Sequence, residues 1–209
     1  MALPGRPLLL QVQPKMQAGT MALTAVASGQ REDHFTIQAS APRANTVHDA
    51  TNGTLSDAMQ DIFLLSTECM VLNWKGVVVP LSYKYELSEM TQDIVEMLAA
   101  VRAASHGAYS VQWPSSGFLA HWLLSWDHET LTVDARWTSA GGLEHILNQR
   151  SPLCTSRDAF CAEWKKPLLT ILLAVRGAGY DSALEGLDAL SDCVDALPSF
   201  GVLYRDPPV

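Results

Sequence analysis

Histidine side chains are the groups in this sequence best suited to acid–base chemistry near neutral pH. His121, His128 and His145 stand in the second half of the chain, and Asp127 directly precedes His128. These residues suggest a small hydrolase or transferase in which a His/Asp pair moves a proton. The His-Glu-x-x-His spacing that places two zinc ligands on one helix face does not occur, so we expect no metal site from them.

Covalent catalysis has even less support. The chain contains no Gly-x-Ser-x-Gly elbow and no cysteine in a protease-like context, and Cys154 near His145 is the one nucleophile–base pair that the sequence suggests. Cys69, Cys161 and Cys193 complete the set of cysteines without forming a Cys-x-x-Cys pair. We therefore expect reduced, largely buried thiols in a cytoplasmic protein, with no catalytic residue and no cofactor.

Composition excludes several further classes of function. The 209 residues include 14 basic and 22 acidic side chains, giving a formal net charge of -8, and residues 56–209 alone hold ten bases and nineteen acids. A surface this acidic repels phosphates, so we expect no nucleic acid partner. Gly177-Ala178-Gly179 joins two helical patterns rather than a strand and a helix, so it is no dinucleotide loop. No run of about 18 apolar residues predicts a membrane span.

The segment from residue 181 to 197 has the clearest pattern in the chain. Its leucines and Val194 recur at helical spacing. The charged residues lie on the other side and are all acidic. Acids three and four positions apart on a helix repel each other by about 0.2–0.5 kcal/mol per pair, a cost that a basic partner would remove. This pattern predicts a partner-binding surface made by Asp181, Glu185, Asp188, Asp192 and Asp195.

Six tryptophans are many for a chain of this length. Trp122 and Trp126 share one face of an alternating segment, and Trp137 follows on the next such segment. Large rings of this kind either build a core or form an aromatic patch for a partner. We include Trp122 and Trp126 among the candidate partner-binding residues, and an exposed tryptophan would also allow a structural homodimer.

The chain divides into a leader, residues 1–55, and a single domain, residues 56–205. The leader is expected to lack structure apart from a short strand at 34–41. In the domain, two apolar runs flank Lys75-Gly76 as a hairpin, with Pro80 at a sheet edge or a bulge. Alternating segments then predict strands and periodic segments predict helices, with a short helical turn at 143–148 and a last strand at 200–204. The expected strands are 109–113, 118–126 and 131–137, and the expected helices are 88–105, 156–177 and 181–197.

Short connections between the three strands require antiparallel pairing, because a parallel pair needs a crossover of about a dozen residues. The expected fold is α+β, with an antiparallel meander sheet of about five strands and three main helices packed against it.

The acidic stripe, the Trp-rich hairpin from Trp122 to Trp137 and the lack of catalytic motifs make the chain resemble, in type, the small acidic immunity proteins of bacterial toxin systems. Residues 73–85, Asn-Trp-Lys-Gly followed by a Pro-Leu-Ser-Tyr-Lys-Tyr run, are also distinctive. The resemblance covers residues 56–205 and transfers no functional residue. It implies a cytoplasmic, non-enzymatic protein that neutralises a basic toxin by binding it, with the small hydrolase and the homodimer as alternatives.

Overall fold

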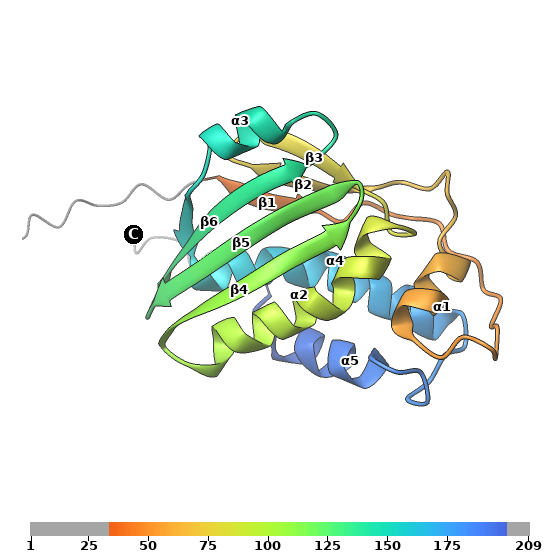
Figure 1. The fold of residues 1–209 in the computed structure, drawn as a ribbon. Coiled ribbons are helices and arrows are strands. Elements are labelled where there is room, and N and C mark those ends of the chain that lie inside the picture. Colours follow the sequence, from red (N-terminus) through yellow and green to blue (C-terminus); the bar gives the residue numbers. More distant parts are fainter. Residues whose placement is uncertain (1–33, 200–209) are drawn as a thin grey trace, which may run out of the picture.

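The computed structural model describes residues 34–199. The predictions of an unstructured leader over residues 1–33 and of a strand at 200–204 lie outside the described residues. Two antiparallel sheets form the framework, one behind the other in Figure 1. The first contains β1 (Phe35–Gln38), β2 (Met70–Trp74) and β3 (Val77–Leu81), in the order β1-β2-β3.

The β2–β3 hairpin forms as its sequence predicts. Lys75 and Gly76 have φ values of 50° and 88°, and the Asn73 side chain accepts a hydrogen bond of 2.9 Å from Gly76 N. Two successive positive φ angles are the turn geometry that matches the twist of paired strands. Pro80 lies on β3, an edge strand of this sheet, so of the two predicted positions, an edge or a bulge, it occupies an edge.

The second sheet contains the predicted meander. Its strands are β4 (His106–Ser115), β5 (Phe118–Asp127), β6 (Thr130–Ser139) and β7 (Leu153–Ser156), paired antiparallel in that order. One face carries the buried residues of all three long strands, and the other faces solvent. The second face of β6 carries Thr130, Thr132, Asp134, Arg136 and Thr138, as its alternation predicts.

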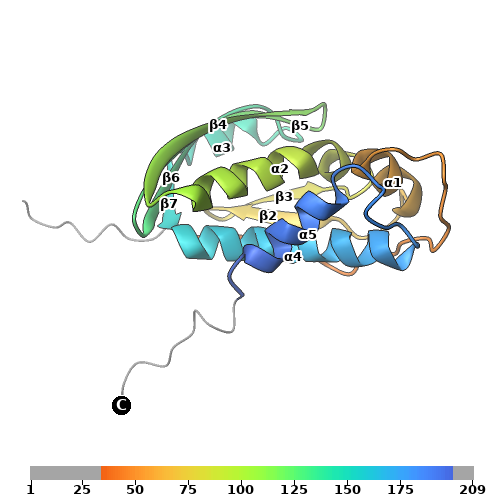
Figure 2. The ribbon, with the colours of Figure 1, turned by 90° about the horizontal axis from the view of Figure 1, so that it is seen from below.

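Five helices complete the described chain. Figure 2 shows α2 between the layers of the two sheets on the side nearest the viewer, with α5 beside α2 and α4. No helix within residues 34–199 is long and apolar enough to cross a lipid bilayer. The helices are α1 (Leu55–Ile62), α2 (Glu86–Ala103), α3 (Glu144–Gln149), α4 (Arg157–Gly177) and α5 (Leu187–Ala196).

The expected single sheet of about five strands and three main helices is thus corrected to sheets of three and four strands with five helices. The sheets are separate because the 18-residue helix α2 lies between β3 and β4 in the chain. The first sheet also includes β1, which lies where the sequence predicted a short strand at 34–41, and Phe35 and Ile37 of β1 are buried. The four-residue strand β7 was missed because it is too short to show alternation.

A cluster of aromatic rings fills the space between the sheets. The ring centroid of Trp122 on β5 lies 5.2 Å from that of Trp74 on β2 and 5.1 Å from that of Trp113 on β4. Both distances lie in the range of favourable aromatic pairs. The buried indole N–H groups in this cluster have no hydrogen-bond acceptor among the described residues, so ring packing must offset their desolvation. These groups belong to Trp74, Trp113, Trp122, Trp137 and Trp164.

A buried ion pair on α4 closes the outer edge of β1. The Glu163 carboxylate, 3% exposed, accepts a hydrogen bond from Ile37 N and lies 2.7 Å from Lys166 Nζ. Lys166 Nζ in turn donates to Ile37 O at 3.0 Å. Two side chains therefore satisfy the backbone groups that a further strand would otherwise bond.

Candidate protein-binding surface

Three of the five predicted acids lie on α5. Asp188, Asp192 and Asp195 are exposed on the side opposite Leu187, Leu190 and Val194, which are buried. The predicted start of this helix at residue 181 is wrong, because Gly186 has a φ of 92° and caps a helix that begins at Leu187.

The other two acids precede the helix. Asp181 accepts a hydrogen bond of 3.0 Å from Ala183 N within a turn, so its carboxylate is not part of the helical row. The backbone of Glu185 forms two hydrogen bonds with the residues on either side of Thr54. Glu185 N donates to Gly53 O, and Glu185 O accepts from Leu55 N, so the segment is held against the start of α1. The predicted single row of five acids is therefore three on α5 and two before it.

A second acidic row was missed as part of the surface. Glu89, Asp93 and Glu96 follow one another on α2 at steps of four and three, the same spacing as Asp188, Asp192 and Asp195 on α5. In the sequence these acids precede Arg102 on the same predicted helix, an order that the helix dipole favours. Their shared spacing was the signal, but only the tertiary contact between α2 and α5 joins the two rows.

A cleft of about 570 Å³ lies where α1, α2 and the start of α5 meet. Ala189, on the first turn of α5, forms part of its wall. Three carboxylates converge on this cleft, two from α2 and one from the loop before α5. The residues that matter for its charge and shape are Glu89, Gln92, Glu96, Glu185, Gly186 and Ala189.

We call the seven carboxylates around this cleft and along α5 the acidic face. Its members are Glu89, Asp93, Glu96, Glu185, Asp188, Asp192 and Asp195. The ion pairs between described residues are Asp127–His128 and Glu163–Lys166, so no carboxylate of the acidic face forms an ion pair within residues 34–199, although Arg176 does donate to Ser191 Oγ on α5.

The electrostatic effect appears on two residues at the border of the acidic face. Burial and the neighbouring Glu96 raise the pKa of Asp93 above its ordinary value. Burial, followed by the charges of Glu96 and Asp93, also raises the pKa of Tyr109 on β4. Asp93 and Glu96 therefore lie near enough to Tyr109, on the edge strand β4, to act on its ionisation.

Trp122 and Trp126 do not belong to this surface. They are 0% and 7% exposed, and both point into the core between the sheets. Trp126 Nε1 also donates to Ala104 O at 3.1 Å. Their placement among the partner-binding residues is corrected, because alternation assigned them one face of β5 without showing that this face is covered. The remaining tryptophans are buried as well, so none offers a surface for a homodimer.

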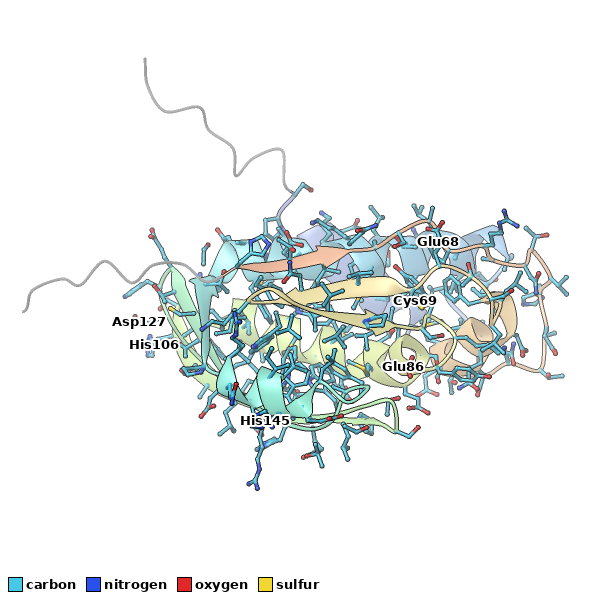
Figure 3. The ribbon with its side chains drawn as sticks, turned by 90° about the horizontal axis from the view of Figure 1, so that it is seen from above. Glu68, Cys69, Glu86, His106, Asp127 and His145 are labelled. Atoms are coloured by element: carbon cyan, nitrogen blue, oxygen red, sulfur yellow. The ribbon has the colours of Figure 1, made fainter. Side chains whose placement is uncertain are left out.

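The residues of the hydrolase hypothesis lie in three separate places. His128 and Asp127 form a 3.5 Å pair at the exposed β5–β6 turn, and His121 lies on the outer face of β5 with its Nε2 2.7 Å from Ser110 Oγ. His145 lies on α3 and contacts Gln149. Figure 3 shows Asp127 beside His106 at one end of the molecule, well apart from His145. No hydrogen bond or ion pair between described residues joins His121, His145 and the Asp127–His128 pair to one another.

None of the four cysteines forms a disulfide with another, and Cys161 is buried while the other three are partly exposed. Burial raises the pKa of Cys161 to about 12 and that of Cys193 to about 11. Both thiols therefore stay protonated near neutral pH, which makes them poor nucleophiles. Within residues 34–199, no cluster of three or more His, Cys, Asp or Glu side chains could hold a metal ion.

Comparison with models of protein families, with curated proteins and with solved structures found no match.

Proposed function

We propose that this chain is a non-enzymatic binding protein whose acidic face docks a basic protein, most concretely a cytoplasmic immunity protein that neutralises a basic toxin domain. The observation that carries the proposal is the meeting of three carboxylates, those of Glu89, Glu96 and Glu185, at a cleft without a basic side chain among its lining residues, beside the helix α5 that carries the second acidic row. A solvated surface normally mixes both signs of charge. Lys and Arg side chains of a partner would remove the repulsion and speed association.

Asp93 supports the proposal because it is unfavourable for the free protein. Burial and Glu96 make its ionised form costly in the folded state. Groups that cost stability in the free protein are frequent where a protein binds a partner.

We expect Asp93→Asn to raise the unfolding temperature at pH 7 while weakening partner binding. Because the pKa of Asp93 is higher in the folded than in the unfolded state, its ionisation destabilises the fold as pH rises above the ordinary value of 3.8. The increase in unfolding temperature of the Asp93→Asn variant should therefore vanish below about pH 3.8, where Asp93 of the unchanged protein is protonated in both the folded and the unfolded state. Thermal unfolding of both proteins between pH 3 and pH 7 checks this; a gain that stays constant with pH would contradict it.

The binding proposal is tested by affinity capture from the native cell at low and high salt. The bait carries Asp188, Asp192 and Asp195 either unchanged or replaced by Asn. We expect the unchanged bait to retain a basic protein that elutes as salt rises, and the triple variant to lose it. Rebinding of the purified partner then measures the loss directly.

A matched control bait carries Asp127, Glu129 and Asp158 replaced by Asn. It changes the net charge equally and, like the test bait, removes one acid from the first turn of a helix, here α4 instead of α5. The control should retain the partner. Equal loss in both baits would mean that net charge alone attracts the protein, and no loss in either would contradict a role for the acidic face.

A further inference from the structure

We infer, on the basis of the proposed function, that the basic partner binds by adding an extended segment to the free edge of β4, as a fifth strand of the second sheet. This edge runs along the ten residues His106–Ser115. Strand addition is a common way to bind an extended segment, with affinity from backbone hydrogen bonds and specificity from alternate side chains.

The hydrogen-bond register identifies the groups on this edge. His128 N donates to Ser105 O at 2.5 Å, so the neighbouring pair His106–Asp127 is a non-hydrogen-bonded pair of the antiparallel ladder. The two kinds of pair alternate, so Ala108, Ser110 and Gln112 also direct their N–H and C=O groups away from β5. All three residues are exposed. No backbone hydrogen bond between described residues outside the strand ladders uses these groups.

The other sheet edges carry protective features that β4 lacks. The Glu163–Lys166 pair blocks β1, Pro80 interrupts the five-residue β3, and β7 has four residues. Beyond the end of β7, Asn148 bonds both the N–H and the C=O of Trp137 on β6, at 2.9 Å each. By contrast, β4 is long and uncharged from residue 107 to 115, and its one proline, Pro114, lies near its end. A long, unprotected edge is a template for a further strand.

The negative charge beside this edge favours the binding of a basic segment. Tyr109, between Ala108 and Ser110, is close enough to Asp93 and Glu96 for both to raise its pKa. Every second side chain of an added strand would therefore face these carboxylates, and Lys or Arg suits those positions. The intervening side chains would lie on the outer face of the sheet, next to a shallow hollow of about 460 Å³ whose lining includes Ser110 and Leu123. A second copy of this chain would instead bring two acidic α2 helices together, so we assign the edge to a basic segment.

The test uses a blocked peptide of about eight residues with lysine and threonine alternating, a permuted peptide with its lysines contiguous, and an alternating peptide with every second backbone nitrogen methylated. At about 50 mM salt we expect the alternating peptide to bind about tenfold more tightly than either control. Amide exchange at Ala108, Ser110 and Gln112 should slow by a similar factor on binding.

A protein variant tests the same edge. Ala108→Pro with Gln112→Pro removes two edge N–H groups that β5 does not use, and the matched variant Ala108→Ser with Gln112→Ser keeps them. The proline variant should lose the alternating peptide and the serine variant should retain it. If the proline variant does not fold, binding of the methylated peptide to the unchanged protein tests whether backbone hydrogen bonds at the β4 edge are needed.

The outcomes separate strand addition from the proposed function. Binding that is insensitive to methylation, without protection of β4, overturns strand addition and leaves docking on the acidic face intact. If the protein does not bind the peptide but still retains its captured partner, strand addition is likewise overturned and docking on the acidic face is left intact. Protection of β4 in the protein alone at high concentration would assign the edge to a second copy and overturn the proposal. Failure of both peptide binding and partner capture removes the proposed function itself.

Discussion

Replacing Trp122 by alanine is expected to lower the free energy of unfolding by about 3–5 kcal/mol, the usual cost of removing a large buried aromatic ring. Its ring has no exposed surface and packs on aromatic rings from β2, β4, β6 and α4. The cavity left by the substitution would lie between the two sheets and would remove aromatic contacts that join them. Urea unfolding followed by far-UV circular dichroism measures the change.

Leu123 provides the matched control, because it is the next residue on β5 and its side chain lies on the opposite, outer face. At 49% exposed, it should lose less than about 1 kcal/mol on replacement by alanine. Similar costs for Trp122→Ala and Leu123→Ala would contradict the arrangement of the two faces of this strand. A Trp122→Ala protein that kept full stability but lost its partner would return Trp122 to the binding surface.

Glu163→Ala is expected to destabilise the protein by about 1–3 kcal/mol, because it removes the buried carboxylate that lies 2.7 Å from Lys166 Nζ. It also leaves Ile37 N without its acceptor. Hydrogen exchange at the Ile37 amide should therefore rise more than exchange in β2, and denaturant unfolding should shift to lower concentration.

Glu163→Gln is the companion variant, since it keeps an oxygen that can accept from Ile37 N while removing the negative charge. The free energy of unfolding of Glu163→Gln should lie between that of Glu163→Ala and that of the unchanged protein. If Glu163→Ala costs less than about 1 kcal/mol, the clamp on β1 adds little to stability. If the glutamine variant is as unstable as the alanine variant, the charge of Glu163 matters more than its hydrogen bond.

Local patterns in the sequence predicted those parts of the fold that depend on neighbouring residues. The apolar stripe with Phe160, Trp164 and Leu168 placed α4 to within a residue of its start, and Ser156 caps that helix. The β4–β5–β6 meander and the turn at Lys75-Gly76 formed as expected. Helix and strand periods identify which side chains share a face, and turn residues identify where the chain reverses.

The candidate surface was only half predictable. Asp188, Asp192 and Asp195 were identified because they repeat along one helix, whereas Glu89, Asp93 and Glu96 acquired meaning only when α2 and α5 met at the cleft. The left-handed backbone at Gly186 excluded Asp181 and Glu185 from that helix. Glycine adopts positive and negative φ about equally, so composition did not indicate this break.

The sequence by itself therefore determined the mixed α and β character, most of the central elements, and the acidic row on the last helix. The tertiary structure alone decided that Trp122 and Trp126 are buried, that β1 joins β2, and that Glu163 closes the edge of β1 from 126 positions away. The reason is physical: a periodic pattern shows which residues point the same way, but burial, pairing and the meeting of two charged rows depend on what packs against that side.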